Sequence, residues 1–200
     1  MESESGLPPL RRCRVKLDDL ADALDMGNME MSAYLDLETG EIVYVSDEAR
    51  RELDAVYETM PDDSGQMSDE EQQAAFTVAL EEYGPVNVEE EELIDADAVD
   101  RGLGTRFIAL PEADTRESYR DMEAFIETAT APRFQQRLDR AIRGRGAFRR
   151  FKDELFDEPD ERERWFAFKQ ERLRDRVREW LTDERIKLMK RPIDATTKEG

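Results

Sequence analysis

Residues 144–153, G-R-G-A-F-R-R-F-K-D, join two predicted helices in the C-terminal half of the chain, and we call this stretch the box. Two glycines flank an arginine at its start, and glycine readily ends one helix and begins another. Phe148 and Phe151 follow at a spacing of three residues, which places both on one face of the second helix. We therefore predict a joint between two helices at which Phe148, Phe151, Leu155 and Phe156 pack into a core.

The cations of the box have two interpretations. In the first, they pair with carboxylates of the same chain and only stabilise the joint. In the second, the free N–H groups and the dipole at the start of the second helix bind a phosphate or a carboxylate. The candidate residues for binding an anion or a partner are Arg143, Gly144, Arg145, Gly146, Arg149, Arg150 and Lys152. Neither a Walker sequence nor G-x-G-x-x-G is present, so the sequence indicates no specific nucleotide fold.

The charge of the chain is strongly asymmetric. The 200 residues carry a formal net charge of −20. Residues 1–130 hold 10 cations and 35 carboxylates, whereas residues 131–200 hold 20 cations and 15 carboxylates. A field this negative repels nucleic acid at long range, which disfavours nucleic acid as a partner without excluding it. The basic C-terminal part favours an acidic protein or a phosphate-bearing ligand instead.

The chain has no histidine and one cysteine, Cys13. This composition excludes histidine-dependent hydrolysis, histidine-bound zinc, intrachain disulfides and thiolate metal clusters. The acidic run D-A-D-A-V-D (95–100) lacks the spacing of a calcium-binding loop, so we interpret it as part of a linker. We thus expect no catalytic residue, no metal site and no cofactor, and the sequence favours a protein that is not an enzyme.

The composition also bears on location and domain organisation. No run of about 18 apolar residues is present, and the first residues are acidic where a signal peptide needs cations, which predicts no membrane contact and a cytoplasmic location. An apolar fraction of 38% and a charged fraction of 40% are typical of a chain with one core and some loose segments. We predict a single domain over residues 13–190, an acidic variable segment at about 62–104, and disordered tails at 1–12 and 192–200.

Residues 32–45 give the clearest strand pattern, because two runs rich in Tyr, Leu, Ile and Val flank Glu38-Thr39-Gly40. Glycine supplies the positive φ that a hairpin loop needs, so we predict a β-hairpin. Shorter strand patterns cover residues 14–17, 106–110 and 185–189. Helical spacing of apolar residues predicts helices over about 18–24, 47–60, 69–83, 115–126, 132–143, 147–156 and 161–182, the last with a buried stripe beginning at Phe166. The predicted class is α+β: a small, mostly antiparallel sheet (N-terminal strand, hairpin and strand 106–110) covered by a mainly helical C-terminal half.

Several stretches resemble one bacterial family. They are Y-L-D-L-E-T-G-E-I-V (34–43), I-A-L-P (108–111), R-A-I-R with the box (140–153), W-F-x-F-K (165–169) and E-W-L (179–181). Together they resemble the uncharacterised protein family UPF0158 over residues 13–60 and 105–190, and we expect the region between to vary. The resemblance implies a small soluble bacterial protein and implies no mechanism.

Three functional hypotheses follow from the sequence. The first is a non-catalytic cytoplasmic binding or adaptor protein that turns a basic C-terminal helical face toward an acidic partner. The alternative is a regulator that binds RNA or a nucleotide phosphate through the box. The third is a histidine-free, Mg²⁺-dependent enzyme that acts on a phosphorylated substrate.

Overall fold

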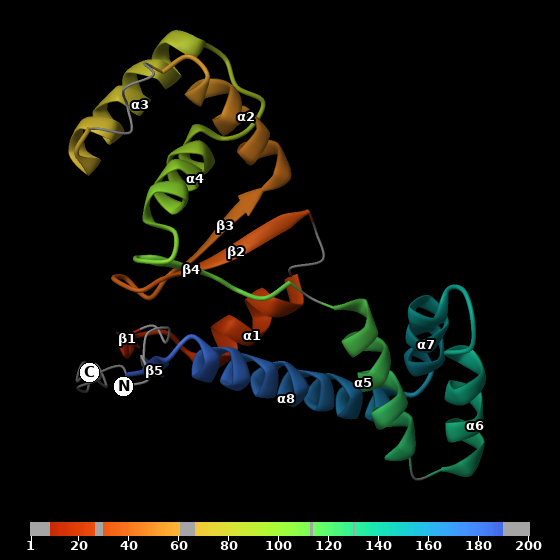
Figure 1. The fold of residues 1–200 in the computed structure, drawn as a ribbon. Helices are drawn as coiled ribbons and strands as arrows, with labels where there is room; N and C mark the ends of the chain where they lie inside the picture. Colours follow the sequence, from red (N-terminus) through yellow and green to blue (C-terminus); the bar gives the residue numbers. More distant parts are fainter. Residues whose placement is uncertain (1–8, 27–29, 61–66, 113, 130, 190–200) are drawn as a thin grey trace, which may run out of the picture.

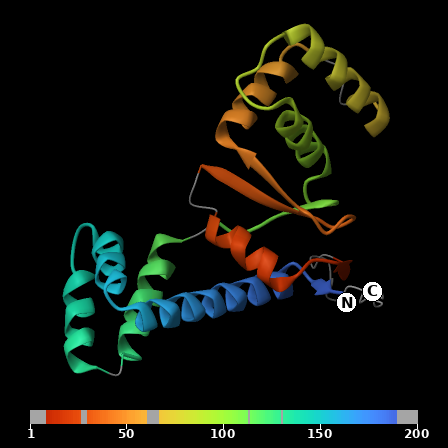
Figure 2. The same ribbon diagram turned by 180° about the vertical axis from the view of Figure 1, so that it is seen from behind.

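The computed structural model describes residues 9–26, 30–60, 67–112, 114–129 and 131–189 and confirms an α+β fold (Figure 1). A small sheet carries three helices on one side and a long C-terminal helix on the other, and three further helices gather at the far end of that long helix (Figures 1 and 2). The predicted disorder of residues 192–200 and of most of residues 1–12 falls outside the described residues.

The predicted hairpin is confirmed and forms the centre of the three-stranded sheet. Strands β2 (Met31–Asp36) and β3 (Ile42–Ser46) pair antiparallel, and β4 (Phe107–Ala109) adds antiparallel to β2, giving the order β3-β2-β4. Side chains alternate between the two faces of β2, so Tyr34 enters one hydrophobic cluster while Ala33 and Leu35 enter another. The sheet therefore separates two cores.

Asp36 and Gly40 fix the hairpin loop. The Asp36 carboxylate accepts the backbone N–H of Glu38 at 2.8 Å and pairs with the Arg106 guanidinium at 2.6 Å. Gly40 has a φ of +78°, and a Cβ at this position would lie 2.1 Å from the carbonyl oxygen of Arg14. The loop thus needs glycine for two reasons, the left-handed backbone and the close approach of another backbone segment.

The two ends of the described chain form a separate parallel sheet of β1 (Arg11–Cys13) and β5 (Ile186–Leu188). The predicted strand at 14–17 is wrong, because pairing ends at Cys13 and helix α1 (Leu17–Met26) already begins at Leu17. Strand 185–189 is confirmed in position, but it pairs with β1. The physical reason is that α1 packs along α8 (Pro159–Asp183), so the strand before α1 meets the strand after α8.

Helices α2 (Asp47–Tyr57), α3 (Asp69–Tyr83) and α4 (Glu90–Gly102) cover the Tyr34 face of the sheet. The side chains of Ser46 and Ser68 cap the N-termini of α2 and α3. The linker interpretation of residues 95–100 is wrong, because these residues lie within α4. Leu93, Ala96 and Val99 are buried, and the buried Asp97 carboxylate accepts hydrogen bonds from Tyr57 and Arg101. Burial of this face, with its one carboxylate satisfied, makes an acidic segment helical.

Helices α5 (Thr115–Glu127), α6 (Pro132–Ala141) and α7 (Ala147–Phe156) surround the N-terminal end of α8 (Figure 1). Their core centres on the rings of Phe125, Phe151 and Trp165, which meet edge to face with centroids 4.8–6.2 Å apart. Such contacts are favourable for aromatic pairs, so this cluster is a third, aromatic core in addition to the two that the sheet separates.

Three aromatic residues predicted to be buried are exposed. Phe148 is 38% exposed, Phe156 is 72% exposed and Phe166 is 59% exposed. Successive helical residues are 100° apart, so the inward position of Phe151 turns Phe156 outward and leaves Phe148 at the edge, and the buried Trp165 turns its neighbour Phe166 to the surface.

Candidate functional site

The box forms the predicted joint between α6 and α7. Gly144 and Gly146 have φ values of +77° and +80°, and Gly146 directly precedes the first residue of α7. Phe151 and Leu155 are buried in the aromatic core, as predicted. The two glycines thus reverse the chain and seat α7 against α6.

Arg150 turns back into this joint. Its Nε donates to the carbonyl oxygen of Ala141 at 2.9 Å and its Nη2 to that of Arg143 at 2.7 Å, while its Nη1 donates to Arg145. These carbonyls belong to the end of α6 and to the turn after it. A guanidinium here satisfies carbonyls that the helix leaves free and neutralises the negative end of its dipole. Arg150 therefore has a structural role at this joint, and its place among the anion-binding candidates stays a prediction.

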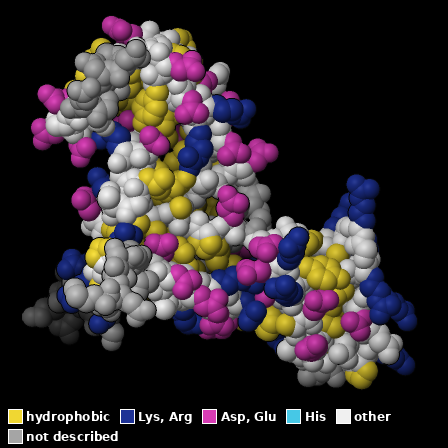
Figure 3. All heavy atoms as spheres, in the orientation of Figure 1, with side chains coloured by type: hydrophobic (Ala, Val, Ile, Leu, Met, Phe, Trp, Pro, Cys, Tyr) yellow, Lys and Arg dark blue, Asp and Glu magenta, His cyan; other side chains and the backbone are white. Residues whose placement is uncertain are grey.

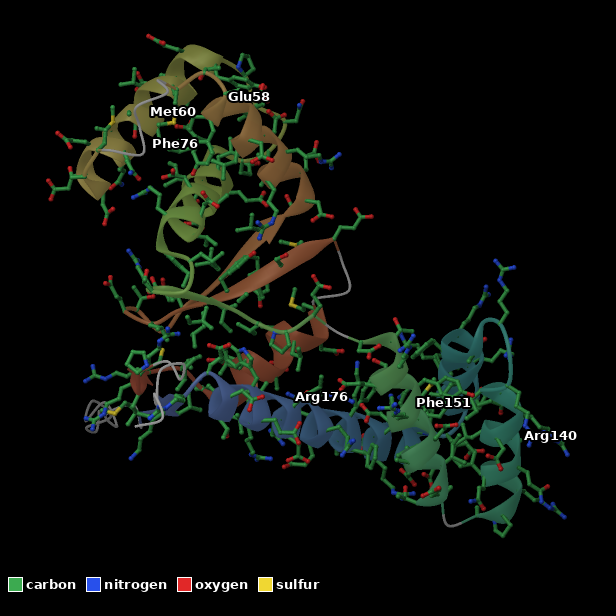
Figure 4. The ribbon with its side chains drawn as sticks, in the orientation of Figure 1. Glu58, Met60, Phe76, Arg140, Phe151 and Arg176 are labelled. Atoms are coloured by element: carbon green, nitrogen blue, oxygen red, sulfur yellow. The ribbon has the colours of Figure 1, made fainter. Side chains whose placement is uncertain are left out.

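Other arginines of this region point into solvent. They are Arg133, Arg140, Arg143, Arg145 and Arg149, and we call this surface of α6 and α7 the basic end. The Arg149 side chain is 90% exposed, and its nearest carboxylate, Asp153, lies 4.0 Å away. Within the described ranges, the other four have no carboxylate within ion-pairing distance. Figure 4 shows Arg140 directed away from the body of the protein, and Figure 3 shows cations spread over this end.

The arginines of α8 behave differently. Five of its six arginines form ion pairs with carboxylates, namely Arg164, Arg172, Arg174, Arg176 and Arg178. The buried Asp121 of α5 is held by two of them, Arg172 at 2.9 Å and Arg176 at 2.6 Å. Arg172, Arg174 and Arg176 thus attach α8 to α5 and α1, whereas Arg178 pairs only within α8. The basic end keeps most of its charge unpaired although carboxylates outnumber cations in the chain.

Lys152 lies apart from the basic end, on a cleft beside α7. This α5–α8 cleft is a hollow of 360 Å³ between α1, α5, α7 and α8. The sequence interpretation missed it, because its walls come from four separate segments. The signal that could have indicated it is the recurrence of Trp165, Lys169, Leu173 and Arg176 at spacings of three and four residues on one helix.

The remaining candidates have structural explanations. The Asp36 carboxylate holds the hairpin loop through the N–H of Glu38 and the Arg106 guanidinium. Burial raises the pKa of the Cys13 thiol, which donates to the carbonyl oxygen of Asp36. Among the described residues, no group of three metal-binding side chains occurs, and no described helix is long and apolar enough to cross a membrane.

The comparisons with known proteins agree with the resemblance seen in the sequence. The chain is 25% identical over 178 residues to a UPF0158 protein of Pseudomonas aeruginosa, and the match covers 88% of this chain and 87% of the relative. No solved structure matches the chain. The model of the family described as "Uncharacterised protein family (UPF0158)" matches residues 85–198, which include α4, the box and α8. With more than half of its length matched, the chain belongs to the UPF0158 family.

Proposed function

We propose that this chain is a non-catalytic cytoplasmic binding protein that holds an acidic partner protein at its basic end. The observation that carries the proposal is the exposed, unpaired state of Arg140, Arg143 and Arg145 in a chain of net charge −20. Free arginines offer a planar, multiply donating group to carboxylates and are enriched where proteins meet.

The position of the basic end supports an acidic partner. The strongly acidic helices α3 and α4 lie at the opposite end of the molecule (Figures 1 and 3). Salt screens charges beyond about 10 Å, so the local arginines decide what binds at this end. A long nucleic acid would extend beyond the basic end, and the carboxylates of the rest of the chain would repel its phosphates. This repulsion favours a compact acidic protein segment over nucleic acid as the partner.

Fluorescence anisotropy tests the proposal. The probes are a labelled peptide of glutamates and aspartates and a labelled oligouridylate of similar charge. We expect the peptide to bind the wild-type chain, and the triple variant Arg143→Gln, Arg145→Gln, Arg149→Gln to weaken its binding about tenfold or more, since each lost charge pair contributes up to about 1 kcal/mol.

A matched control removes cations from another exposed surface. Arg116 and Arg120 of α5 are exposed and have no carboxylate partner in the part of the chain that the structure describes. The variant Arg116→Gln, Arg120→Gln should keep peptide binding. Equal losses in both variants would mean attraction by overall charge and would refute the proposal. Tighter binding of the oligouridylate, lost in the triple variant, would instead support the RNA alternative.

A further inference from the structure

The α5–α8 cleft follows one face of the long helix. The side chains that α8 contributes to it include Trp165, Lys169, Leu173, Arg176, Trp180 and Asp183. Their spacings of three and four residues form a stripe along the helix from Trp165 to Asp183, a rise of about 27 Å at 1.5 Å per residue. Figure 4 shows Arg176 near the middle of α8 and Phe151 where α7 faces α5. The cleft therefore runs beside one face of α8.

The floor of the cleft is apolar. Met122, Phe151 and Leu173 form part of it and are buried. Phe148 is 38% exposed at one wall, and Trp180 is partly exposed at another. A hollow of 360 Å³ beside exposed aromatic rings accommodates a few apolar side chains of a ligand.

The rim of the cleft has more unpaired carboxylates than unpaired cations. Seven carboxylate residues and three cationic residues line it. Lys169 is paired with Asp25, and Arg176 is paired with Glu117 and Asp121.

The unpaired lining residues decide the preferred ligand charge. In the described structure, the side-chain carboxylates of Glu112, Glu179 and Asp183 have no ion-pair or hydrogen-bond partner. Lys152 is the one cationic lining residue whose side chain has no such partner among the described residues. The rim is thus complementary to a ligand with several positive charges.

We propose that the α5–α8 cleft binds an amphipathic, cationic helix of a partner protein. Apolar side chains at positions i, i+3, i+4 and i+7 of that helix fill the hollow against Phe148 and Trp180, and its lysines or arginines pair with Glu112, Glu179 and Asp183. This site does not rest on the proposed function, because no arginine of the basic end lines the cleft. A chain that used both surfaces would connect two partners of opposite charge.

Both tryptophans of the chain, Trp165 and Trp180, line the cleft, so intrinsic fluorescence reports its occupancy without a label. The probe is a synthetic helical peptide of leucines and lysines with leucine at i, i+3, i+4 and i+7. The control is the same peptide with glutamate in place of lysine. At physiological salt, we expect the lysine peptide to change the emission saturably and the glutamate peptide to leave it unchanged.

Two sets of variants locate the binding. The double variant Glu179→Gln, Asp183→Asn should bind the lysine peptide about tenfold more weakly than the wild type does. Phe148→Ala should also weaken binding of this peptide while the protein stays folded. The matched control, Asp160→Asn with Glu163→Gln, removes two exposed carboxylates of α8 that do not line the cleft, and it should bind as the wild type does.

Three outcomes would overturn the proposal. Equal weakening in the control pair would mean general attraction to an acidic protein. If the glutamate peptide bound as tightly as the lysine peptide, the carboxylates of the rim would not select a cationic ligand. A dimer in sedimentation velocity that dissociates in the Glu179→Gln, Asp183→Asn variant would assign the cleft to a second copy of the chain.

Discussion

Arg150 gives the sharpest test of how the box works, and we predict that Arg150→Ala destabilises the protein while Arg149→Ala does not. The two residues are neighbours with the same side chain, and the sequence offers no reason to separate them. In the structure, Arg150 donates to four backbone carbonyls of the α6–α7 joint, and Arg149 is 90% exposed with one carboxylate 4.0 Å away.

The expected magnitude follows from the carbonyls that lose a donor. Ala141 is buried, so its carbonyl loses the Arg150 hydrogen bond where water replaces it poorly, at a cost of about 1–3 kcal/mol. Removing a cation from the end of α6 adds about 0.3–1 kcal/mol. The carbonyls of Arg143 and Arg145 belong to exposed residues that water can reach. We therefore expect a loss of about 2 kcal/mol for Arg150→Ala and less than about 0.5 kcal/mol for Arg149→Ala.

Urea unfolding followed by circular dichroism measures this difference. With an m-value of about 2 kcal/mol per molar urea, the Arg150→Ala midpoint should fall by about 1 M. Arg150→Lys keeps the charge but loses the planar guanidinium that reaches four carbonyls, so its midpoint should lie between those of wild type and Arg150→Ala. Equal midpoints for Arg150→Ala and Arg149→Ala would refute the structural role assigned to Arg150.

The remaining predictions concern the hairpin and the aromatic core. Gly144→Ala should lower the free energy of unfolding by about 1 kcal/mol, because φ is +77° but there is space for a Cβ. Gly40→Ala should lower it by at least about 2 kcal/mol more, because the Cβ would clash with the backbone of Arg14. The urea midpoints of the two variants measure this difference. Phe151→Ala should cost about 3–5 kcal/mol and Phe156→Ala less than about 0.5 kcal/mol in the same assay, and similar losses would contradict the burial described above. Burial disfavours the charged form of Asp36, but hydrogen bonds from Arg106 and two loop N–H groups outweigh it and hold its pKa below the usual value. The stability that this lowered pKa contributes is present above about pH 4 and is lost as the pH falls through the folded-state pKa. In the Asp36→Asn variant, the urea midpoint should therefore fall less steeply below about pH 4 than in the wild type. An unchanged pH profile would contradict the prediction.

Local sequence patterns predicted most elements because their causes are local. Ser46 and Ser68 precede helices whose first turns they cap, and Gly40 marks a loop that needs positive φ. Periodicity failed where two apolar neighbours compete for one face, as with Trp165 and Phe166, because a 100° step decides which one is buried. Periodicity also failed to predict α4, whose acidic sequence is helical because Leu93 and its apolar neighbours pack into a hydrophobic cluster.

By itself, the sequence determined the α+β class, the joint at the two glycines of the box, the exclusion of histidine chemistry, and the concentration of cations after residue 130. Only the tertiary structure decided what those cations do. A long arginine side chain can reach a ligand, a carboxylate or a backbone carbonyl, and the choice depends on acceptors that other segments place nearby. Arg150 donates to the carbonyl end of α6, Arg172 and Arg176 pair with Asp121, and the arginines of the basic end are exposed to solvent.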